Sequence, residues 1–176
     1  MAAANDLHVL VVDDNHQMRV LLRSMLRAAG VGCVSEAGDA AKAFVMMNEA
    51  RVGLILVDWK MQPMDGLDFT RMVRRASNSP NPFVPILMLT AHTEIHRVAA
   101  ARDAGVNGFL RKPVSASVLF ERMTSALTDP RQFVETGDFF GPDRRFGALK
   151  GYSGPLRRSS DTCDDTLDLD DLRLSA

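Results

Sequence analysis

Along its first 128 residues the chain alternates short apolar runs with longer segments in which apolar residues recur every three or four positions. A short apolar run is typical of a strand buried on both faces of a sheet, and the longer spacing is typical of a helix with one buried face. The runs predict five strands, at residues 7–12, 31–35, 54–57, 85–89 and 108–111.

Each predicted strand is followed by a segment with helical spacing. Asp14 or Asn15 can cap the first helix, Gly30 ends it, and Asp39 begins the second. The positions with helical spacing are Met18, Leu21, Leu22, Met25, Leu26 and Ala29; Ala40, Ala43, Phe44 and Met47; Phe69, Met72, Val73 and Ala76; Ile95, Val98, Ala99 and Arg102; and Leu119, Met123, Ala126 and Leu127. Five strand–helix units predict an α/β fold, a doubly wound five-stranded parallel sheet with helices on both faces.

Polar residues stand at or just after the carboxyl ends of these strands, where open parallel sheets bind ligands. They are Asp13, Asp14, Asp58, Thr90 and Lys112. Taken singly, the aspartates can be caps or turn residues, the threonine the end of a strand and the lysine a solvated side chain. Their occurrence at successive strand ends favours a shared site, because the sheet brings these ends to one edge.

The chemistry available to these five side chains is specific. Three crowded carboxylates repel one another, and a hard divalent cation with oxygen ligands, such as Mg²⁺, would offset that repulsion and stabilise an incoming phosphoryl group. Lys112 could balance the phosphoryl charge, and the Thr90 hydroxyl could donate to a phosphoryl oxygen. The central carboxylate, Asp58, would then act as a nucleophile and form an acyl phosphate.

Four motifs together resemble the receiver domain of bacterial two-component response regulators, which has a CheY-like, flavodoxin-like topology. They are DD at 13–14, DWKMQPMDG at 58–66, LTA at 89–91 and FLRKP at 109–113, and the resemblance covers residues 5–128. The site that it implies consists of Asp58 as phosphoacceptor, Asp13, Asp14 and Asp58 as metal ligands, and Thr90, Lys112 and Phe109 as phosphoryl-sensing residues. Phe109 would be the aromatic residue that turns inward when Thr90 moves; the alternative is a plain core position.

Composition limits the size, location and partners of the protein. The chain has 176 residues, of which 46% are hydrophobic, so one domain with a tail is expected. A net charge of −1 excludes a protein that binds polyanions over its whole surface. Cys33 and Cys163 lack the spacing of a metal or redox site. The chain also lacks a signal-peptide pattern and an apolar run of the ~20 residues that span a membrane, so we expect a cytoplasmic protein without membrane insertion.

After residue 127 the chain carries glycine, proline, serine and scattered charge without helical or strand periodicity, so we expect a largely disordered tail. This tail is too short for a DNA-binding output domain, and DNA is not expected as a partner. It nevertheless contains a repeat, aromatic-x-Gly-Pro-x-Arg-Arg, at residues 139–145 and 152–158. Five basic residues and no acidic one lie in 144–158, whereas six aspartates lie in 161–171.

Two copies of an arginine pair beside an aromatic residue suit a ligand with two similar halves. Arginine can contact phosphate oxygens or the O6/N7 edge of guanine, and an aromatic ring can stack on a base. Asp143 can accept from the N1 and N2 hydrogens of guanine. A cyclic dinucleotide presents two of each group. The alternative is a solvated basic linker neutralised by the aspartates that follow, and the repeat weighs against it.

Residues 131–158, with RQFV at 131–134 and both Gly-Pro-x-Arg-Arg copies, resemble the arginine-rich segment of the Cle class of CheY-like proteins. The resemblance implies that cyclic di-GMP orders the tail and that the bound form docks on the flagellar motor switch protein FliM, tuning motility and surface attachment. The implied cyclic di-GMP contacts are Arg131, Phe139, Asp143, Arg144, Arg145, Tyr152, Arg157 and Arg158. The expected division is a receiver domain at 5–128, an arginine-rich segment at 129–160 and an acidic tail at 161–176.

Two other functions stay open. One is a phosphorylation-driven single-domain response regulator or phosphorelay intermediate, with a sensor histidine kinase as partner. The other is an RNA- or single-strand-binding protein, which would bind any oligonucleotide with strong salt dependence. Whether it acts as the cyclic di-GMP-binding regulator or as the phosphorylation-driven regulator, the chain is not expected to be an enzyme beyond self-catalysed phosphorylation and dephosphorylation of its aspartate. Motor docking would also recruit it to the flagellated pole.

Overall fold

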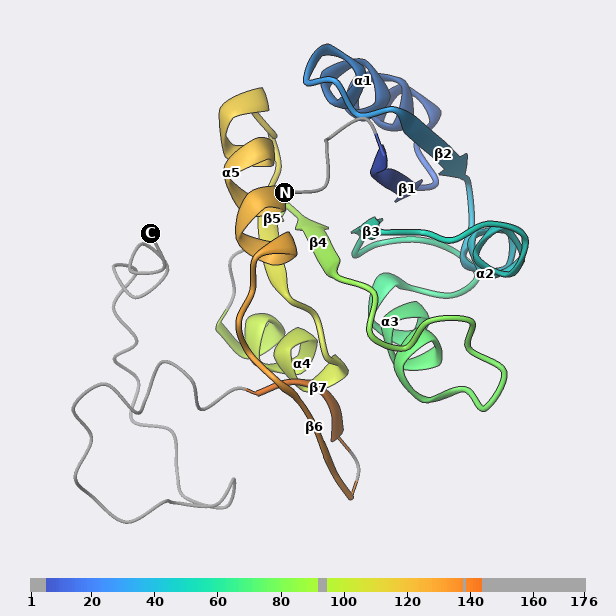
Figure 1. Cartoon of the computed structure of the whole chain (residues 1–176), viewed down its shortest axis with the longest axis vertical. Helices are drawn as coiled ribbons and strands as arrows, with labels where there is room; N and C mark the ends of the chain where they lie inside the picture. Colours follow the sequence, from blue (N-terminus) through green and yellow to red (C-terminus); the bar gives the residue numbers. More distant parts are fainter. Residues whose placement is uncertain (1–5, 92–94, 138, 144–176) are drawn as a thin grey trace, which may run out of the picture.

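The computed structural model describes residues 6–91, 95–137 and 139–143, and a five-stranded parallel sheet forms its centre (Figure 1). The strands are β1 (His8–Val12), β2 (Cys33–Ala37), β3 (Leu54–Asp58), β4 (Ile86–Thr90) and β5 (Gly108–Arg111). Their order in the sheet is β2-β1-β3-β4-β5. The predicted doubly wound parallel sheet is confirmed, because every neighbouring pair is parallel.

Four helices connect the five strands, a fifth follows the last strand, and capping side chains settle where four of the five begin. The helices are α1 (His16–Ala28), α2 (Ala40–Glu49), α3 (Gly66–Arg75), α4 (Ile95–Ala104) and α5 (Ala116–Leu127). Asn15, rather than Asp14, caps α1: its Oδ1 accepts from the N–H groups of Gln17 and Met18 at 2.9 and 3.2 Å. Among the residues that the structure describes, no helix is long and apolar enough to cross a membrane.

β2 begins at Cys33 rather than at residue 31. The reason is the turn that ends α1, where Gly30 has φ +81° and the Val31 N–H donates to the Leu26 carbonyl at 3.1 Å. Val31 is buried in this turn, 4% exposed. An apolar residue that closes a helix therefore has the same sequence signature as the first residue of a strand.

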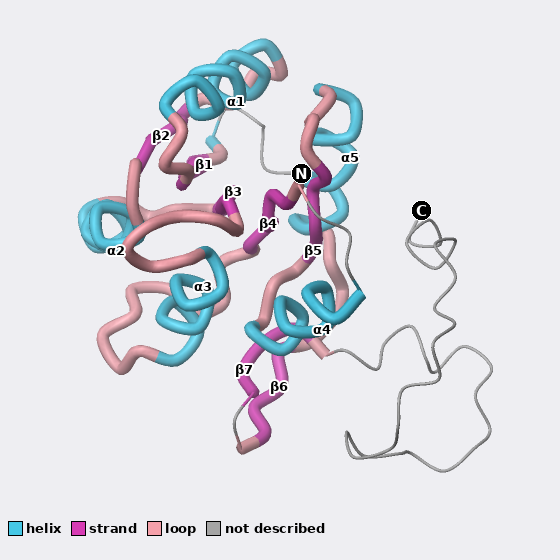
Figure 2. Tube along the Cα trace, turned by 180° about the vertical axis from the view of Figure 1, so that it is seen from behind, coloured by secondary structure: helices cyan, strands magenta, loops and turns pink. Residues whose placement is uncertain are grey.

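Alternate residues of the central strands point to opposite faces of the sheet and build two apolar layers. The layer against α1 and α5 contains Val9, Val11, Leu54, Leu56, Leu87 and Leu89. The layer against α2, α3 and α4 contains Leu10, Val12, Ile55, Val57, Ile86 and Met88. Figure 2 shows α1 and α5 on one side of the sheet and the other three helices on the opposite side. All five residues of β3 and of β4 are buried, as expected for strands in the middle of such a sheet.

A β-hairpin follows α5, whereas the expected tail after residue 127 was largely disordered and contained no strand. Its strands are β6 (Phe133–Thr136) and β7 (Phe139–Pro142), which pair antiparallel, and β7 packs on α3 and α4 (Figure 1). Phe139 is 7% exposed and Pro142 is buried. Four-residue strands give too short an alternation to detect, and the order of this segment comes from its docking on the helices.

Candidate functional site

Three carboxylates meet at the carboxyl edge of the sheet. Val12 and Val57 are register partners on the neighbouring strands β1 and β3, so Asp13 and Asp58 follow side by side. Oxygen atoms of Asp13, Asp14 and Asp58 lie within 4.8 Å of one another. Asp13 is fully buried and Asp58 is 7% exposed, whereas Asp14 is exposed. This set of hard oxygen ligands, open to solvent on one side, fits a Mg²⁺ ion.

Lys112 brings a positive charge to the two buried carboxylates. It follows β5, and its backbone N–H donates to the Thr90 carbonyl at 2.8 Å, which fixes the start of the loop. Its Nζ lies 3.0 Å from Asp13 Oδ2 and 2.8 Å from Asp58 Oδ1. Burial lowers the pKa of the Lys112 ammonium, but its hydrogen bonds and charge contacts with Asp58 and Asp13 outweigh burial and raise that pKa.

Asp58 combines burial with a strong positive partner. Burial raises the pKa of its carboxyl above the ordinary value, and the charge of Asp13 adds to this effect. The hydrogen bond and the charge of Lys112 act in the opposite direction and favour the carboxylate. The result is a carboxylate shielded from water on most sides with a cation beside it, which is an environment suited to a nucleophile.

The loop after β3 presses its backbone against Asp58. A Cβ atom on Gly66 would lie 2.2 Å from the Asp58 carbonyl oxygen, so only glycine permits this close approach. The Gly66 N–H donates to the Trp59 carbonyl at 2.9 Å, and the Asp65 side chain caps α3. This local packing fixes the backbone of Asp58 and therefore the position of its carboxylate.

Thr90 and Phe109 lie on the neighbouring strands β4 and β5. Thr90 ends β4 and is 6% exposed, which places it at the same edge as the carboxylates. Phe109 pairs with Met88, is partly buried and packs against the apolar layer of α2, α3 and α4. The structure thus brings Thr90 to the acidic edge together with Asp13, Asp14, Asp58 and Lys112. Phe109 lies on β5 two residues before Arg111, the register partner of Thr90, as a partly buried aromatic residue.

Arg19 supports the acidic edge and was not found from the sequence. Its Nη1 donates to the Asp13 carbonyl at 2.7 Å, and its Nε lies 3.6 Å from Glu36 Oε2. The side chain therefore holds the turn between β1 and α1 against β2. An arginine in the first turns of an amphipathic helix carries no sequence signal for such a role, since charged residues are ordinary there.

The predicted cyclic di-GMP contacts are only partly within the described residues. Arg131 and Phe139 belong to the folded domain: the Arg131 Nε donates to both carboxylate oxygens of Asp129 at 2.8 and 3.0 Å, and Phe139 is buried in β7. Asp143 follows β7, and its N–H donates to the Gln132 carbonyl at 2.8 Å. The remaining predicted contacts lie outside the described residues and are Arg144, Arg145, Tyr152, Arg157 and Arg158.

Arg74 is a second residue that sequence reasoning missed. It is 3% exposed, and its guanidinium donates to the carbonyls of Pro82, Val84 and Gly105 at 2.7, 2.8 and 2.9 Å and to Asn107 Oδ1 at 3.1 Å. Its guanidinium carbon also lies 5.1 Å from the centre of the Phe133 ring. Burial lowers its pKa to about 9. Arg74 therefore joins α3, the start of β4, the end of α4 and the hairpin.

Comparisons with known proteins agree with this geometry. A model of the response regulator receiver domain matches residues 9–124. The chemotaxis protein CheY of Pseudomonas aeruginosa is 35% identical over 115 residues, which are 65% of this chain and 91% of that protein. CheY-3 of Vibrio cholerae is 31% identical over 118 residues, covering 67% of this chain and 89% of the relative. The solved structure of V. cholerae CheY4 superposes with a TM-score of 0.64 at 32% identity, covering 69% of this chain and 98% of that one.

Proposed function

Since the chain belongs to the response regulator receiver domain family, we propose that it is a CheY-like signalling protein that accepts a phosphoryl group on Asp58. The observation that carries this proposal is the position of Lys112, whose Nζ lies within 3.0 Å of an oxygen of both Asp13 and Asp58. A lysine held by two buried carboxylates is ready to neutralise an anion that arrives between them.

The proposed roles follow from the positions of the side chains. An Asp58 carboxylate oxygen attacks the phosphorus of the donor, and the bond from phosphorus to the donor's leaving group breaks as the new oxygen–phosphorus bond forms. Mg²⁺ bound by Asp13, Asp14 and Asp58 would supply charge neutralisation for this step. Lys112 balances the charge of the product, and the Thr90 hydroxyl donates to a phosphoryl oxygen. Phe109 responds to the position of Thr90, and a sensor histidine kinase is the natural donor.

A mass measurement tests this first proposal. The chain is incubated with Mg²⁺ and a small phosphodonor such as acetyl phosphate, and a mass increase of one phosphoryl group is expected. Asp58→Asn should abolish the increase, whereas Asp68→Asn, which alters an exposed carboxylate of α3, should keep it. Phosphorylation of the Asp58→Asn protein to the level of the unaltered chain would overturn the assignment of the phosphoacceptor.

The arginine-rich segment carries a second proposal, that the chain also binds cyclic di-GMP. The supporting observation is the doubled aromatic-x-Gly-Pro-x-Arg-Arg motif, which resembles the segment of the Cle class and of CleD in particular. The first copy begins in β7, which packs on α3 and α4, so the Arg144–Arg145 pair follows directly from the folded domain. Residues 129–160 would be the ligand-binding segment, and 161–176 an acidic tail.

The ligand-bound form is proposed to dock on the flagellar motor switch protein FliM and thereby to tune motility and surface attachment, with recruitment to the flagellated pole. The similarity to the chemotaxis proteins CheY of P. aeruginosa and CheY-3 of V. cholerae supports an output in motility. Coupled folding and binding would give the tail a bound form with a new protein-binding surface, at a cost in ordering of a few kcal/mol.

Calorimetric titration with cyclic di-GMP tests the second proposal. The full chain and Asp58→Asn should bind, whereas a variant with Arg144 and Arg145 both changed to alanine should lose most of its affinity. Capture of purified FliM should require cyclic di-GMP. A FliM interaction that depends on Asp58 phosphorylation and is unchanged by cyclic di-GMP would instead favour the phosphorylation-driven regulator. Salt-sensitive binding of any oligonucleotide would favour the nucleic-acid-binding protein.

A further inference from the structure

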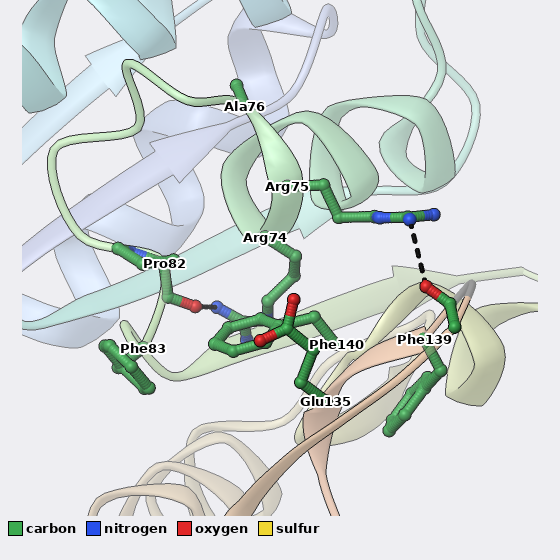
Figure 3. Close-up of a pocket in the computed structure, with 9 residues that line it drawn as sticks. Arg74, Arg75, Ala76, Pro82, Phe83, Glu135, Phe139 and Phe140 are labelled. Carbon is green, nitrogen blue, oxygen red and sulfur yellow. Dashed lines mark hydrogen bonds between the residues drawn. The ribbon is translucent and has the colours of Figure 1, made fainter.

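A pocket of about 370 Å³ lies between the carboxyl end of α3, the segment that leads to β4, and the β6–β7 hairpin (Figure 3). Its lining includes the side chains of Arg74, Arg75, Phe83, Glu135 and Phe140. The volume falls within the range of about 300–1,000 Å³ that is common for small-molecule sites. Phe83 of this pocket lies three residues before β4 begins at Ile86, whereas the acidic site lies at the opposite edge of the sheet, where β4 ends at Thr90.

Three phenylalanine rings form an edge-to-face aromatic cluster in this region. The Phe83 ring centre lies 5.3 Å from the centres of both Phe133 and Phe140, and each pair has an interplanar angle of 68°. Arg74 packs against this cluster, because its buried guanidinium lies over the Phe133 ring. Phe83 is nevertheless 55% exposed, so a large part of its ring can contact another molecule. An exposed ring held by two others is a ready stacking surface for a planar base.

Charged groups of both signs lie around this aromatic cluster. Figure 3 shows the Arg75 guanidinium at the hairpin end of the pocket, where it donates to the Gly137 carbonyl at 3.3 Å, and the Glu135 carboxylate beside Phe140. A carboxylate can accept the N1 and N2 hydrogens of guanine, whereas adenine carries no hydrogen on N1. The guanidinium charge suits a phosphate. The pocket thus combines stacking, guanine-selective and phosphate-binding groups.

The pocket is also joined to the predicted ligand-binding segment through the backbone of β7. A Cβ atom on Gly141 would lie 2.7 Å from the Gly105 Cα, and one on Gly105 would lie 2.6 Å from the Phe140 carbonyl oxygen. These close approaches lock β7 onto the end of α4. Phe140 lines the pocket, and Arg144 follows it by four residues, a span of at most about 14 Å of extended chain. The first arginine pair is therefore tethered by a short stretch of chain to a residue that lines the pocket.

We propose that this pocket receives one guanine base of cyclic di-GMP, with Phe83 stacking on the base, Glu135 accepting its N1 and N2 hydrogens, and Arg75 facing the adjoining phosphate. The inference rests on the proposed binding of cyclic di-GMP and adds a receiver-domain half to the ligand site. It also explains how the first repeat copy can take part although Phe139 is buried: the exposed aromatic ring comes from Phe83 instead.

Titration of the full chain with cyclic di-GMP and with cyclic di-AMP tests this inference. Phe83→Leu removes the flat ring but keeps an apolar side chain, and we expect roughly tenfold weaker binding, within the range of base–aromatic stacking. Glu135→Gln should weaken cyclic di-GMP binding by a similar factor and reduce the preference over cyclic di-AMP. Matched controls are Val45→Ala and Glu49→Gln, which alter exposed residues of α2 and should bind like the unaltered chain.

The outcomes separate the two proposals. Binding by the unaltered chain, Phe83→Leu and Glu135→Gln with equal affinity would overturn the pocket inference and leave ligand binding by the arginine-rich segment in place. Absence of binding by the unaltered chain would overturn the proposed cyclic di-GMP function and the pocket inference with it. Thermal unfolding of each variant shows whether the fold is kept, and magnetisation transfer between the Phe83 ring and guanine H8 would report the stacking directly.

Discussion

At the scale of single residues, Arg74 holds several separate backbone segments together. It is almost fully buried and donates hydrogen bonds to three backbone carbonyls and to the Asn107 side chain. A buried acceptor that loses its donor costs the free energy of its desolvation. We expect Arg74→Met to lower the free energy of unfolding by about 3 kcal/mol, since methionine fills the space but donates nothing. Urea denaturation measures the loss.

The control for this change lies one helical turn earlier. Arg71 is half exposed and pairs with Asp68 at 2.9 Å on the outer face of α3. Exposed pairs of this kind contribute little, so Arg71→Met should stay within about 0.5 kcal/mol of the unaltered chain. Equal stability of the two methionine variants would show that the Arg74 hydrogen bonds contribute nothing net to the fold.

Asp129 gives a residue-scale prediction for pH. Burial alone would raise the pKa of its carboxyl, but the hydrogen bonds and charge of Arg131, with a contribution from Asn107, lower it below the ordinary value. A carboxyl with a lowered pKa stabilises the fold above its ordinary pKa, and this contribution is lost as the pH falls through the lowered value. Asp129→Asn should therefore flatten the decline in unfolding free energy below about pH 4. Asp68→Asn, on an exposed carboxylate, should leave the decline unchanged.

At the scale of elements, the sequence predicts what is determined by local pattern and misses what depends on docking. β3 and β4 were predictable because each is an apolar run buried on both faces. Asp13, Asp58 and Lys112 were predictable because strand ends meet at one edge. The hairpin and the role of Arg74 were not predictable. Each depends on the contact between Arg74 and Phe133, which are far apart in the sequence and meet only in the folded chain.

The hairpin as an element should depend on the absence of a side chain at Gly141. Its Cβ position lies 2.7 Å from a backbone atom of Gly105, which cannot move aside as a flexible side chain could. We expect Gly141→Ala to release β7 from α4, so that amide hydrogen exchange in β6 and β7 becomes fast while exchange in β1 and β3 stays slow. Thr136→Ala, on an exposed position of the same hairpin, should keep the protection. Slow exchange in both variants would show that the close approach is easily relieved.

At the scale of the whole molecule, the proposed phosphoryl site and the pocket lie towards opposite ends of β4, and two elements, β4 and α4, connect their surroundings. β4 begins at Ile86, whose N–H donates to the Asn107 side chain held by Arg74, and it ends at Thr90. α4 follows Thr90 in sequence and ends at Ala104, just before Gly105, against which β7 packs. Thr90 thus belongs to the acidic edge as the last residue of β4, and the hairpin that lines the pocket packs on α4. Two sites arranged in this way can bias a common conformational equilibrium.

This arrangement predicts that the two proposed inputs reinforce each other. A phosphoryl group that holds Thr90 would restrict the end of β4, and cyclic di-GMP would then bind beside a β4 that is already restricted, with less loss of conformational entropy. We expect beryllofluoride with Mg²⁺, as a phosphoryl mimic, to tighten cyclic di-GMP binding by about fivefold or more, with the reciprocal effect on beryllofluoride binding. Calorimetry on the unaltered chain, Asp58→Asn and Gly141→Ala measures both. Only the unaltered chain should show the coupling; equal coupling in Gly141→Ala would mean that it does not pass through the hairpin.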